Sequence, residues 1–331
     1  MPEPTPAVLV LGDTRGLLHH GCELVVEGLL QLLQEAGATK VDVVPGLQGK
    51  TDRSDVRQAE LVVLNGEGML HHDRPVVEET LALAEDRRRR GLRTKLVNFS
   101  WFHNRQSSTQ RLVAFEGLAP RDGSTAATLR EAGHSFFLMT DVAPHQTLRM
   151  VHPPEQRCGI VVGDSTQPSV ARALRKLAQH RRWSLAPVLI PPGERSGRKA
   201  RKIARRLQAS RLVGSWILSD RYRGHRDGDA KTVDHLQRLG KAEGVVTGRF
   251  HQVCMALALG TPFLAVGSNT AKIEALCGDV GLDPTRRMVD PEEIANVHSV
   301  PPLSDQEQRC LDDWRRGLPS QWDRLRDWIV S

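Results

Sequence analysis

The chain has 331 residues, 39% of them hydrophobic and 26% charged, with a formal net charge of +7, and this length allows two domains with hydrophobic cores. No apolar run approaches the roughly 20 residues that a membrane-spanning helix requires, and residues 1–6 lack the basic start of a signal peptide. The five cysteines lack the spacing of a zinc site or a disulfide framework, so we interpret them as reduced core thiols of a cytoplasmic protein.

Short apolar segments alternate with amphipathic ones through the first half of the chain. Their composition predicts strands at Ala7–Leu11, Val41–Val44, Leu61–Leu64, Lys95–Asn98 and Ser135–Met139. The intervening periodicity predicts helices at Cys22–Glu35, Val76–Arg89, Gln106–Phe115 and Ser124–Ala132. This alternation indicates a parallel sheet with helices on both faces.

The proline-bearing segment Val151–Glu155 is the predicted linker, because the same alternation starts again after it. The second half predicts strands at Cys158–Val162, Ser184–Ile190, Leu212–Ile217, Val245–Val246 and Phe263–Val266. It predicts helices at Val170–His180, Lys199–Gln208 and Lys231–Leu239, then at two segments beginning near Phe250 and Asn269. We therefore expect two doubly wound Rossmann-like α/β domains, residues 1–152 and 153–303, and a helical segment, residues 304–331, that packs back on the body.

Polar residues follow the last two predicted strands. Arg249 and His251 come after Val245–Val246, and Lys272 comes after Phe263–Val266. Because parallel strands end at one edge of the sheet, these three side chains form a predicted cationic cluster beside two helix N-termini. Such a cluster suits a phosphate or a carboxylate, and the alternative is that the same residues only cap helices or form surface ion pairs.

The order of motifs around this cluster resembles the polysaccharide pyruvyl transferase family. The resemblance rests on Gly248-Arg249-Phe250-His251, Gly260-Thr261-Pro262 and the segment from Lys272 to Leu276. Upstream it rests on the strand and glycine-rich loop Leu61–Leu70, Arg121-Asp122-Gly123-Ser124 with Leu129 and Gly133, and Asp141, and downstream on Asp279–Leu282. The resemblance covers about residues 9 to 285 and implies a GT-B-like, two-domain transferase that moves pyruvate from phosphoenolpyruvate onto a sugar as a ketal.

The loops after the N-terminal strands supply further candidates. Gly12–Gly16, which contains Arg15, allows a close approach of the backbone to a ligand. Asn65, Gly66 and Gly68 lie in the glycine-rich loop after the third strand, and the resemblance implies that they bind substrate. Glu67 and Asp73 are candidate catalytic acids or bases. His71, His72 and Asp73 could ligate a metal ion, but side chains of adjacent residues rarely reach one ion, so no metal site is expected. Where the family often has G-N-x-G-D-E, this chain has a longer variant with His19-His20-Gly21, which leaves the acceptor side open.

Ketal formation needs two anions bound and one proton delivered, and it requires neither a metal nor a cofactor. His251 is the predicted general acid, or failing that a phosphate donor, because the ordinary pKa of histidine suits proton transfer near neutrality. Arg249 and Lys272 are predicted to bind the anions, joined by Arg15 and Arg121 from the N-terminal domain. The helix start at Ser268 and Asn269 is predicted to add backbone N–H donors.

Two arginine-rich runs, Arg87–Arg90 and Arg195–Arg206, raise the question of an anionic partner. A solvated basic face is favoured over a nucleic-acid groove, because no nucleic-acid-binding motif accompanies the runs, and association with an anionic membrane surface ranks between the two. The expected partners are phosphoenolpyruvate and a saccharide acceptor. The alternatives are a glycosyltransferase that uses a nucleotide sugar on the same frame and a non-enzymatic basic polymer-binding protein. The sequence leaves the oligomeric state and the acceptor sugar open.

Overall fold

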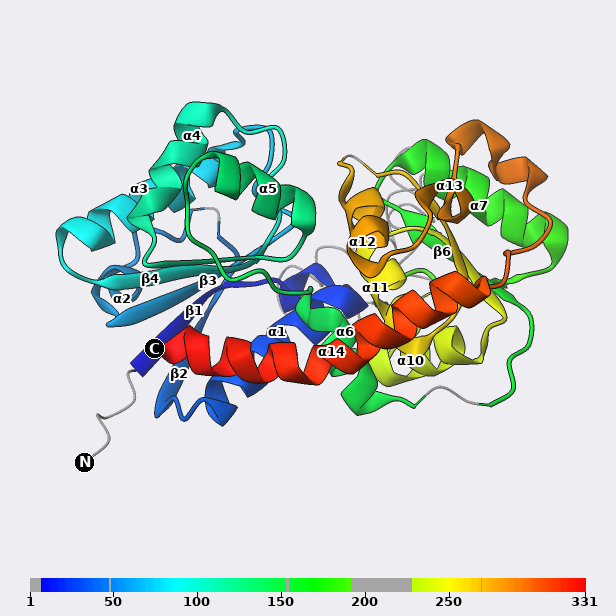
Figure 1. The fold of residues 1–331 in the computed structure, drawn as a ribbon, viewed down its shortest axis with the longest axis horizontal. Coiled ribbons are helices and arrows are strands. Elements are labelled where there is room, and N and C mark those ends of the chain that lie inside the picture. The colour runs from blue at the N-terminus through cyan, green and yellow to red at the C-terminus, as the bar shows by residue number, and fades with distance from the viewer. Residues whose placement is uncertain (1–6, 48, 153–154, 192–227, 269) are drawn as a thin grey trace, which may run out of the picture. The chain divides into compact units, whose positions relative to one another are not determined.

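The structure is a computed structural model that describes residues 7–47, 49–152, 155–191, 228–268 and 270–331. The chain divides into unit 1, which holds Met1–Thr14, Val26–Val142 and Gly317–Ser331, and unit 2, which holds Arg15–Val25 and Ala143–Arg316. Within the described residues each unit contains one five-stranded sheet, with helices between the strands (Figure 1). The prediction of two doubly wound α/β folds is confirmed, and the predicted domain boundaries remain a prediction.

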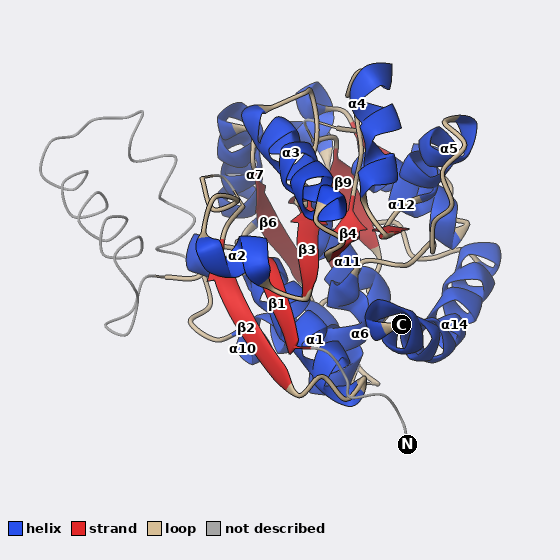
Figure 2. Cartoon of the chain, turned by 90° about the vertical axis from the view of Figure 1, so that its left-hand side faces the viewer, coloured by secondary structure: helices blue, strands red, loops and turns tan. Residues whose placement is uncertain are grey.

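The sheet of unit 1 is parallel and has the strand order β2-β1-β3-β4-β5. Figure 2 shows β2, β1, β3 and β4 side by side. Leu11 pairs with Leu64, and Leu64 pairs with Leu96, so these strands run in step toward one edge. Their apolar residues are buried on both faces, as in a sheet covered by helices on each side. The strands are β1 (Ala7–Asp13), β2 (Lys40–Pro45), β3 (Leu61–Glu67), β4 (Arg93–Phe99) and β5 (Gly117–Pro120).

Two sets of helices cover this sheet. Val77 and Leu81 of α3 and Leu129 of α5 join one core with Leu11 and Leu64 of the strands. Figure 1 shows α1 and the C-terminal part of α14 on the opposite face. The helical elements are α1 (His20–Glu35), α2 (Ser54–Gln58), α3 (Pro75–Arg89), α4 (Gln106–Gln110), α5 (Gly123–Glu131) and the 3₁₀ helices η1 (Arg15–Leu17) and η2 (Arg111–Ala114).

One prediction for unit 1 is wrong, and one predicted helix changes type along its length. Residues Ser135–Met139 form no strand; they lie along β5, which the sequence did not predict, and donate from Phe137 N–H to Leu118 and from Met139 N–H to Pro120. Pro120 has no N–H with which to continue a ladder. The predicted helix at Gln106–Phe115 changes from α4 to η2 at Arg111, whose guanidinium bonds to Glu78 and Glu85 of α3.

The sheet of unit 2 is also parallel and has the order β10-β9-β8-β6-β7 among the described strands. Val170 and Leu174 of α7 pack on Val162 and Val246, and Figure 1 shows α10 and α11 on the other side. The strands are β6 (Ile160–Ser165), β7 (Ser184–Leu185), β8 (Gly244–Gly248), β9 (Phe263–Val266) and β10 (Met288–Val289). The helical elements are α6 (Val142–Met150), α7 (Pro168–Arg181), α10 (Thr232–Lys241), α11 (Phe250–Leu259), α12 (Lys272–Val280), α13 (Pro284–Arg287), η3 (Pro291–Asn296) and α14 (Asp305–Val330).

The predicted strand Ser184–Ile190 is shorter than expected, because only Ser184–Leu185 joins the sheet. Its far end instead pairs antiparallel with the segment before α1, through a bridge between His19 and Leu189. His20 N–H donates to Val188 (3.0 Å) and Ile190 N–H donates to Leu18 (2.9 Å). This pairing fixes the start of α1 in unit 2.

The C-terminal segment is one helix, α14, with Leu311, Trp322, Leu325 and Ile329 buried. At its start Glu307 forms a buried ion pair with Arg287 (2.7 Å), and that guanidinium together with bonds from Ser304 lowers the pKa of Glu307 to about 2 against the cost of burial. The predicted helix Lys199–Gln208, strand Leu212–Ile217, the basic run 195–206 and Pro153–Pro154 lie outside the described residues. Among the helices that are described, none combines the length and apolar character needed to cross a bilayer.

Candidate functional site

The two sheets share one topological feature, a reversal of strand order next to the first strand. In unit 1 the reversal lies between β1 and β3, and in unit 2 it lies between β6 and β8. Open α/β sheets bind ligands beyond the carboxyl ends of the strands at such a switch point. Predicted site residues lie at both points.

At the switch point of unit 2, Arg249 is held by an aspartate. Arg249 follows β8 and occupies the N-cap position of α11, while Asp164 lies near the end of β6. The Asp164 Oδ2 atom accepts hydrogen bonds from Arg249 Nε (3.0 Å) and Nη2 (2.5 Å), and its Oδ1 atom accepts the Val188 N–H (3.1 Å). Asp164 therefore fixes the direction of the guanidinium at the sheet edge.

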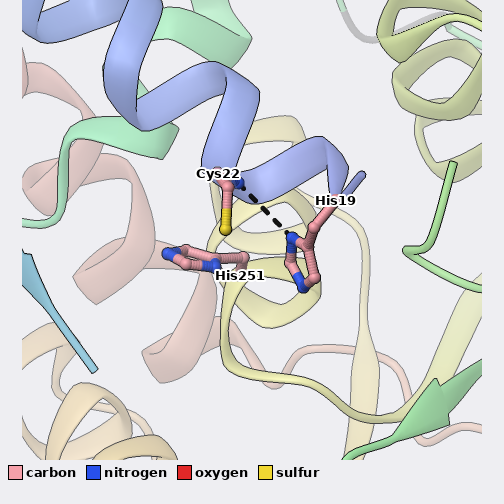
Figure 3. Close-up of side chains that lie close together, drawn as sticks. All are labelled: His19, Cys22 and His251. Carbon is pink, nitrogen blue, oxygen red and sulfur yellow. Dashed lines mark hydrogen bonds between the residues drawn. The ribbon is translucent and has the colours of Figure 1, made fainter. Parts of the chain in front are cut away.

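His251, the second residue of α11, lies beside His19 and Cys22 at the start of α1 (Figure 3). Its side chain is buried, and its ring meets the His19 ring edge-on with centroids 5.4 Å apart. Gly21 makes this approach feasible, because a Cβ atom at that position would lie 2.2 Å from His251 Cβ and 2.4 Å from its Cγ. The contact between α1 and α11 thus depends on a residue without a side chain.

His19 is positioned by both the backbone and its surroundings. Its Nδ1 atom accepts the N–H groups of Gly21 (3.1 Å) and Cys22 (3.4 Å), as a capping residue does at a helix start. Burial, followed by the nearby His251 and Arg249, holds the pKa of His19 well below 6.5. Its imidazole is therefore neutral at pH 7.

His20 and His235 form a second pair of neighbouring histidines in unit 2. The rings of His20 and His235 stack with centroids 4.4 Å apart, and the Nδ1 atom of His235 lies 3.2 Å from Asp229 Oδ2. His20 Nδ1 is 2.9 Å from the Thr232 hydroxyl, which donates to Glu23. Burial, helped by His235, lowers the pKa of His20 to about 3. This network links the first turn of α1 to α10 through the neutral imidazole of His20 and the ring of His235 stacked on it.

Lys272 begins α12, and its Nζ atom lies 5.9 Å from the centre of the Phe250 ring. That ring also meets His251, with centroids 5.5 Å apart, so Phe250 connects two of the predicted cationic residues. The prediction that α12 starts at Ser268–Asn269 is wrong, because the helix begins at Lys272 after a turn in which the Ser268 hydroxyl donates to the Thr270 carbonyl. Ser268 therefore precedes the N-terminus of α12 and is not part of its first turn. Asn269 is outside the described residues.

The switch point of unit 1 carries a different set of groups. Glu67, at the end of β3, is buried, and its Oε1 atom accepts hydrogen bonds from the Thr14 hydroxyl (2.7 Å) and Asn65 Nδ2 (3.1 Å). Its φ of 38° is rare for a residue with a side chain and is the kind of strain that accumulates at functional positions. Gly12 closes the cluster with a φ of 101°, and a Cβ atom there would lie 2.7 Å from the Asn65 carbonyl oxygen.

The remaining predicted residues of unit 1 have structural contacts. Gly66 allows packing, since a Cβ atom would lie 2.4 Å from Phe99 Cβ, and Gly68 lies in the turn after β3. The Asp73 carboxylate accepts from the N–H of Arg105, the N-cap of α4, and from the hydroxyl of Ser108 within that helix. The buried Arg121 pairs with Asp141 (2.6 Å) and donates to Ser100. The roles of Gly66, Gly68, Asp73 and Arg121 toward a substrate stay predictions.

Arg15 starts η1 and is partly buried, and its segment groups with unit 2. Unit 1 also has two surface hollows, of about 580 and 460 Å³, lined by residues of α3 and its neighbours such as Glu85, Arg88 and Asp52. No predicted site residue lines either hollow, so the switch points remain the better candidates on chemical grounds.

Sequence analysis missed four residues that complete the unit 2 site, namely His19, Cys22, Asp164 and His235. The signal for the first two is the short His-x-x-Cys spacing directly before a helix that follows the first strand. Asp164 gives a weaker signal, because its pairing with Arg249 joins residues 85 positions apart. His235 shows no pattern in the sequence.

Residues 19–270 match the family model described as polysaccharide pyruvyl transferase. This match covers most of the chain, so the chain belongs to the polysaccharide pyruvyl transferase family. It is therefore a transferase of saccharide modification, with a pyruvyl donor and a saccharide acceptor. No curated protein sequence matches the chain.

Solved structures with a similar course of the chain include enzymes that bind uridine nucleotides. A MnaA–UDP complex from S. aureus has a TM-score of 0.49 and 12% identity, covering 98% of this chain and 91% of that one. A UDP-glucosyltransferase from Polygonum tinctorium has a TM-score of 0.49 and 9% identity over 100% of both chains. A UDP-GlcNAc 2-epimerase from Neisseria meningitidis has a TM-score of 0.46 and 10% identity, covering 98% and 94%. At these values we draw no conclusion about ligands from them.

Proposed function

We propose that the chain transfers the pyruvyl group of phosphoenolpyruvate to two hydroxyl groups of a sugar, forming a cyclic ketal and releasing phosphate. The observation that supports this proposal is the group formed by Arg249, Asp164, His251 and His19 at the switch point of unit 2. It combines a cation of fixed direction with imidazoles, and it lies inside the part of the chain that matches the family. The corresponding group of unit 1, around Glu67, is assigned to the acceptor.

The donor has two anionic groups, a phosphate and a carboxylate. Asp164 engages Nε and Nη2 of Arg249, so the third guanidinium nitrogen, Nη1, is the atom assigned to one anion. Lys272, which shares Phe250 with His251, is assigned to the other anion. The first backbone N–H groups of α11 add donors at the positive end of that helix.

The proton goes to the methylene carbon of the donor. His251 is assigned to donate it, and the central carbon of the donor becomes cationic and is attacked by the first sugar hydroxyl. The bond from that carbon to the phosphate oxygen then breaks, and the second hydroxyl closes the ketal. Of the two hydroxyl protons, one replaces the proton that His251 gave to the methyl group, and the other leaves with phosphate.

Glu67 is assigned to hold a hydroxyl group of the acceptor sugar by hydrogen bonding. Its carboxylate is held by Thr14 and Asn65, two residues that also bond well to sugar hydroxyls. Asp73 is a weaker candidate for this task, because Arg105 and Ser108 already use its oxygens.

An isotope experiment tests the proposal. In D₂O, turnover with phosphoenolpyruvate should release one phosphate per ketal and place one deuterium in the product methyl group, as read by mass spectrometry. A parallel ligand screen with UDP-sugars separates this reaction from glycosyl transfer. Binding and turnover of a UDP-sugar, with no phosphate released from phosphoenolpyruvate across an acceptor panel, would contradict the proposal.

A further inference from the structure

We propose that His19, Cys22 and His251 form a binding site for a single soft divalent transition-metal ion of the Zn²⁺ type. Each of the three side chains offers one ligand atom, and these atoms all lie within 4.8 Å of one another. Among the described residues this is the group of three that meets such a criterion. Local spacing in the sequence does not predict this site, because His251 lies 229 positions or more along the chain from His19 and Cys22.

The positions of the three side chains follow from the fold. Figure 3 shows His19 directly before α1, Cys22 in the first turn of α1 and His251 on α11, with the Cys22 sulfur directed toward the His251 ring. Ligand atoms around a tetrahedral Zn²⁺ are about 3.3–3.8 Å apart, since the bonds are about 2.0–2.3 Å long. Closure of the site therefore requires an approach of about 1 Å, which side-chain rotation supplies.

The ligand set selects the class of ion. Two imidazoles and one thiolate suit Zn²⁺, Co²⁺ or Ni²⁺, whereas Mg²⁺ and Ca²⁺ prefer oxygen ligands, which this group lacks. Three protein ligands leave a fourth tetrahedral position for water or a substrate group. Burial of Cys22 and His251 protects the site from solvent.

The state of His19 also fits an ion. A backbone N–H can only donate, so the Nδ1 atom that accepts from Gly21 and Cys22 carries a lone pair on the side of Cys22. The bond from the Gly21 N–H has an ordinary length of 3.1 Å and that from the Cys22 N–H is long at 3.4 Å, and an ion bound at Nδ1 takes the place of both. The charge of the neighbouring Arg249 is balanced by Asp164, so the cluster does not face an uncompensated cation.

The geometry that indicates the metal site does not depend on the proposed function, although both proposals assign a role to His251. An ion on the His251 ring takes the lone pair to which a proton would add, so the two states exclude each other. For that reason the test measures metal binding directly and needs no donor, acceptor or turnover.

The experiment titrates the full chain, freed of metal by a chelator and kept reduced, with Co²⁺. We expect one Co²⁺ per chain, a thiolate-to-cobalt absorption band in the near ultraviolet, and loss of that band when Zn²⁺ is added. Cys22→Ser should lose the band and bind Co²⁺ at least about tenfold more weakly. Cys158→Ser is the matched control, because Cys158 is an exposed thiol outside the cluster and its loss should leave the band unchanged.

A second variant guards against a folding defect in Cys22→Ser, which alters a buried residue. His19→Asn changes a partly buried side chain, so it should fold, bind Co²⁺ at least about tenfold more weakly, and keep the thiolate band at saturating Co²⁺. Absence of stoichiometric Co²⁺ binding by the wild type, or an unchanged band in Cys22→Ser, would overturn the proposal. An unchanged Co²⁺ affinity in folded His19→Asn would overturn it as well.

Discussion

The two sheets reverse strand order at equivalent places, yet the chemistry at the two switch points differs. In unit 1 the groups at the strand ends are a carboxylate, an amide and a hydroxyl, from Glu67, Asn65 and Thr14. In unit 2 they are a guanidinium and imidazoles, from Arg249, His251 and His19. The same backbone edge thus presents hydrogen-bonding groups suited to sugar hydroxyls in one unit and a guanidinium with imidazoles, suited to an anion, in the other.

The comparison extends to the ion pairs that stabilise each unit. Arg121–Asp141 in unit 1 and Arg287–Glu307 in unit 2 are buried pairs, whereas Arg249–Asp164 retains exposed surface at a strand end. A buried pair serves the fold, because removal of one partner leaves an unsatisfied charge. A partly exposed pair at a switch point can orient a side chain toward a ligand. The predictions below test this division of roles.

Replacement of Arg121 should have the largest effect on stability. Arg121→Ala leaves the Asp141 carboxylate buried without its partner, so the free energy of unfolding should fall by about 3–5 kcal/mol in urea. Arg249→Ala should lower the free energy of unfolding by less than half as much, because its partner Asp164 keeps some contact with water. If Arg121→Ala were fully stable but failed to bind phosphoenolpyruvate, Arg121 would belong to the substrate site and the division of roles would be wrong.

The pair in unit 2 should show itself in the pH dependence of stability. The folded pKa of Glu307 is about 2, below its ordinary 4.5, so its contribution is present above pH 4.5 and is lost as the pH falls toward 2. A hydrogen bond to a charged group contributes about 1.5–3 kcal/mol, which sets the expected size of this loss. Glu307→Gln should remove that contribution and flatten the acid part of the stability curve, measured by urea unfolding between pH 7 and 3.

The control for Glu307 lies on the same helix. Asp313→Asn removes one partner of an exposed ion pair with Arg316, and its effect should stay within about 0.5 kcal/mol. A Glu307→Gln protein with the wild-type acid profile would show that Arg287 and Glu307 do not carry the stability assigned to them.

His251 should dominate turnover. His251→Gln removes the proposed acid and should lower kcat by about 10²-fold or more, the usual contribution of positioned acid–base catalysis. Glu67→Gln, the matching change in unit 1, should also lower kcat but leave the affinity for phosphoenolpyruvate unchanged. Near-normal turnover in a folded His251→Gln protein would reduce His251 to a packing residue.

Replacement of Gly21 should have a smaller effect on stability. A methyl group there would overlap the His251 side chain, so Gly21→Ala should cost about 1–3 kcal/mol and lower turnover with it. Gly16→Ala is the control, because a Cβ atom at Gly16 meets nothing within 4 Å. Equal thermal stability of the two variants would mean that α1 and α11 do not pack as described.

Local patterns in the sequence were sufficient for most of the fold. Strands β1, β3, β4 and β9 and helices α1, α3, α7 and α11 were predicted because each has a long apolar run or a clear period. The short strand β5 was missed since Gly117–Pro120 has two residues, glycine and proline, that disfavour strands. Ser135–Met139 has the composition of a strand, but it lies beside a neighbour that cannot complete the ladder.

The candidate site was predictable only where its residues lie close in sequence. Arg249, His251 and Lys272 follow adjacent strands, so one topological rule places them near each other. His19 and Cys22 reach His251 through the antiparallel bridge between His19 and Leu189 and the small volume of Gly21. Neither feature has a periodic signal. Tertiary contacts of this kind require the structure.

The most direct test of the account is the binding of phosphoenolpyruvate, measured by titration calorimetry. The wild type should bind one molecule per chain, and Arg249→Gln should weaken binding by about 10–100-fold, the value of a hydrogen bond to a charged group. The double variant Asp164→Asn/Arg249→Gln should bind as weakly, since it also lacks the guanidinium but leaves no unpaired carboxylate. Arg316→Gln, which changes an exposed arginine of the same unit, should bind as the wild type does. Unchanged affinity in both Arg249 variants would contradict the placement of the donor at the switch point of unit 2.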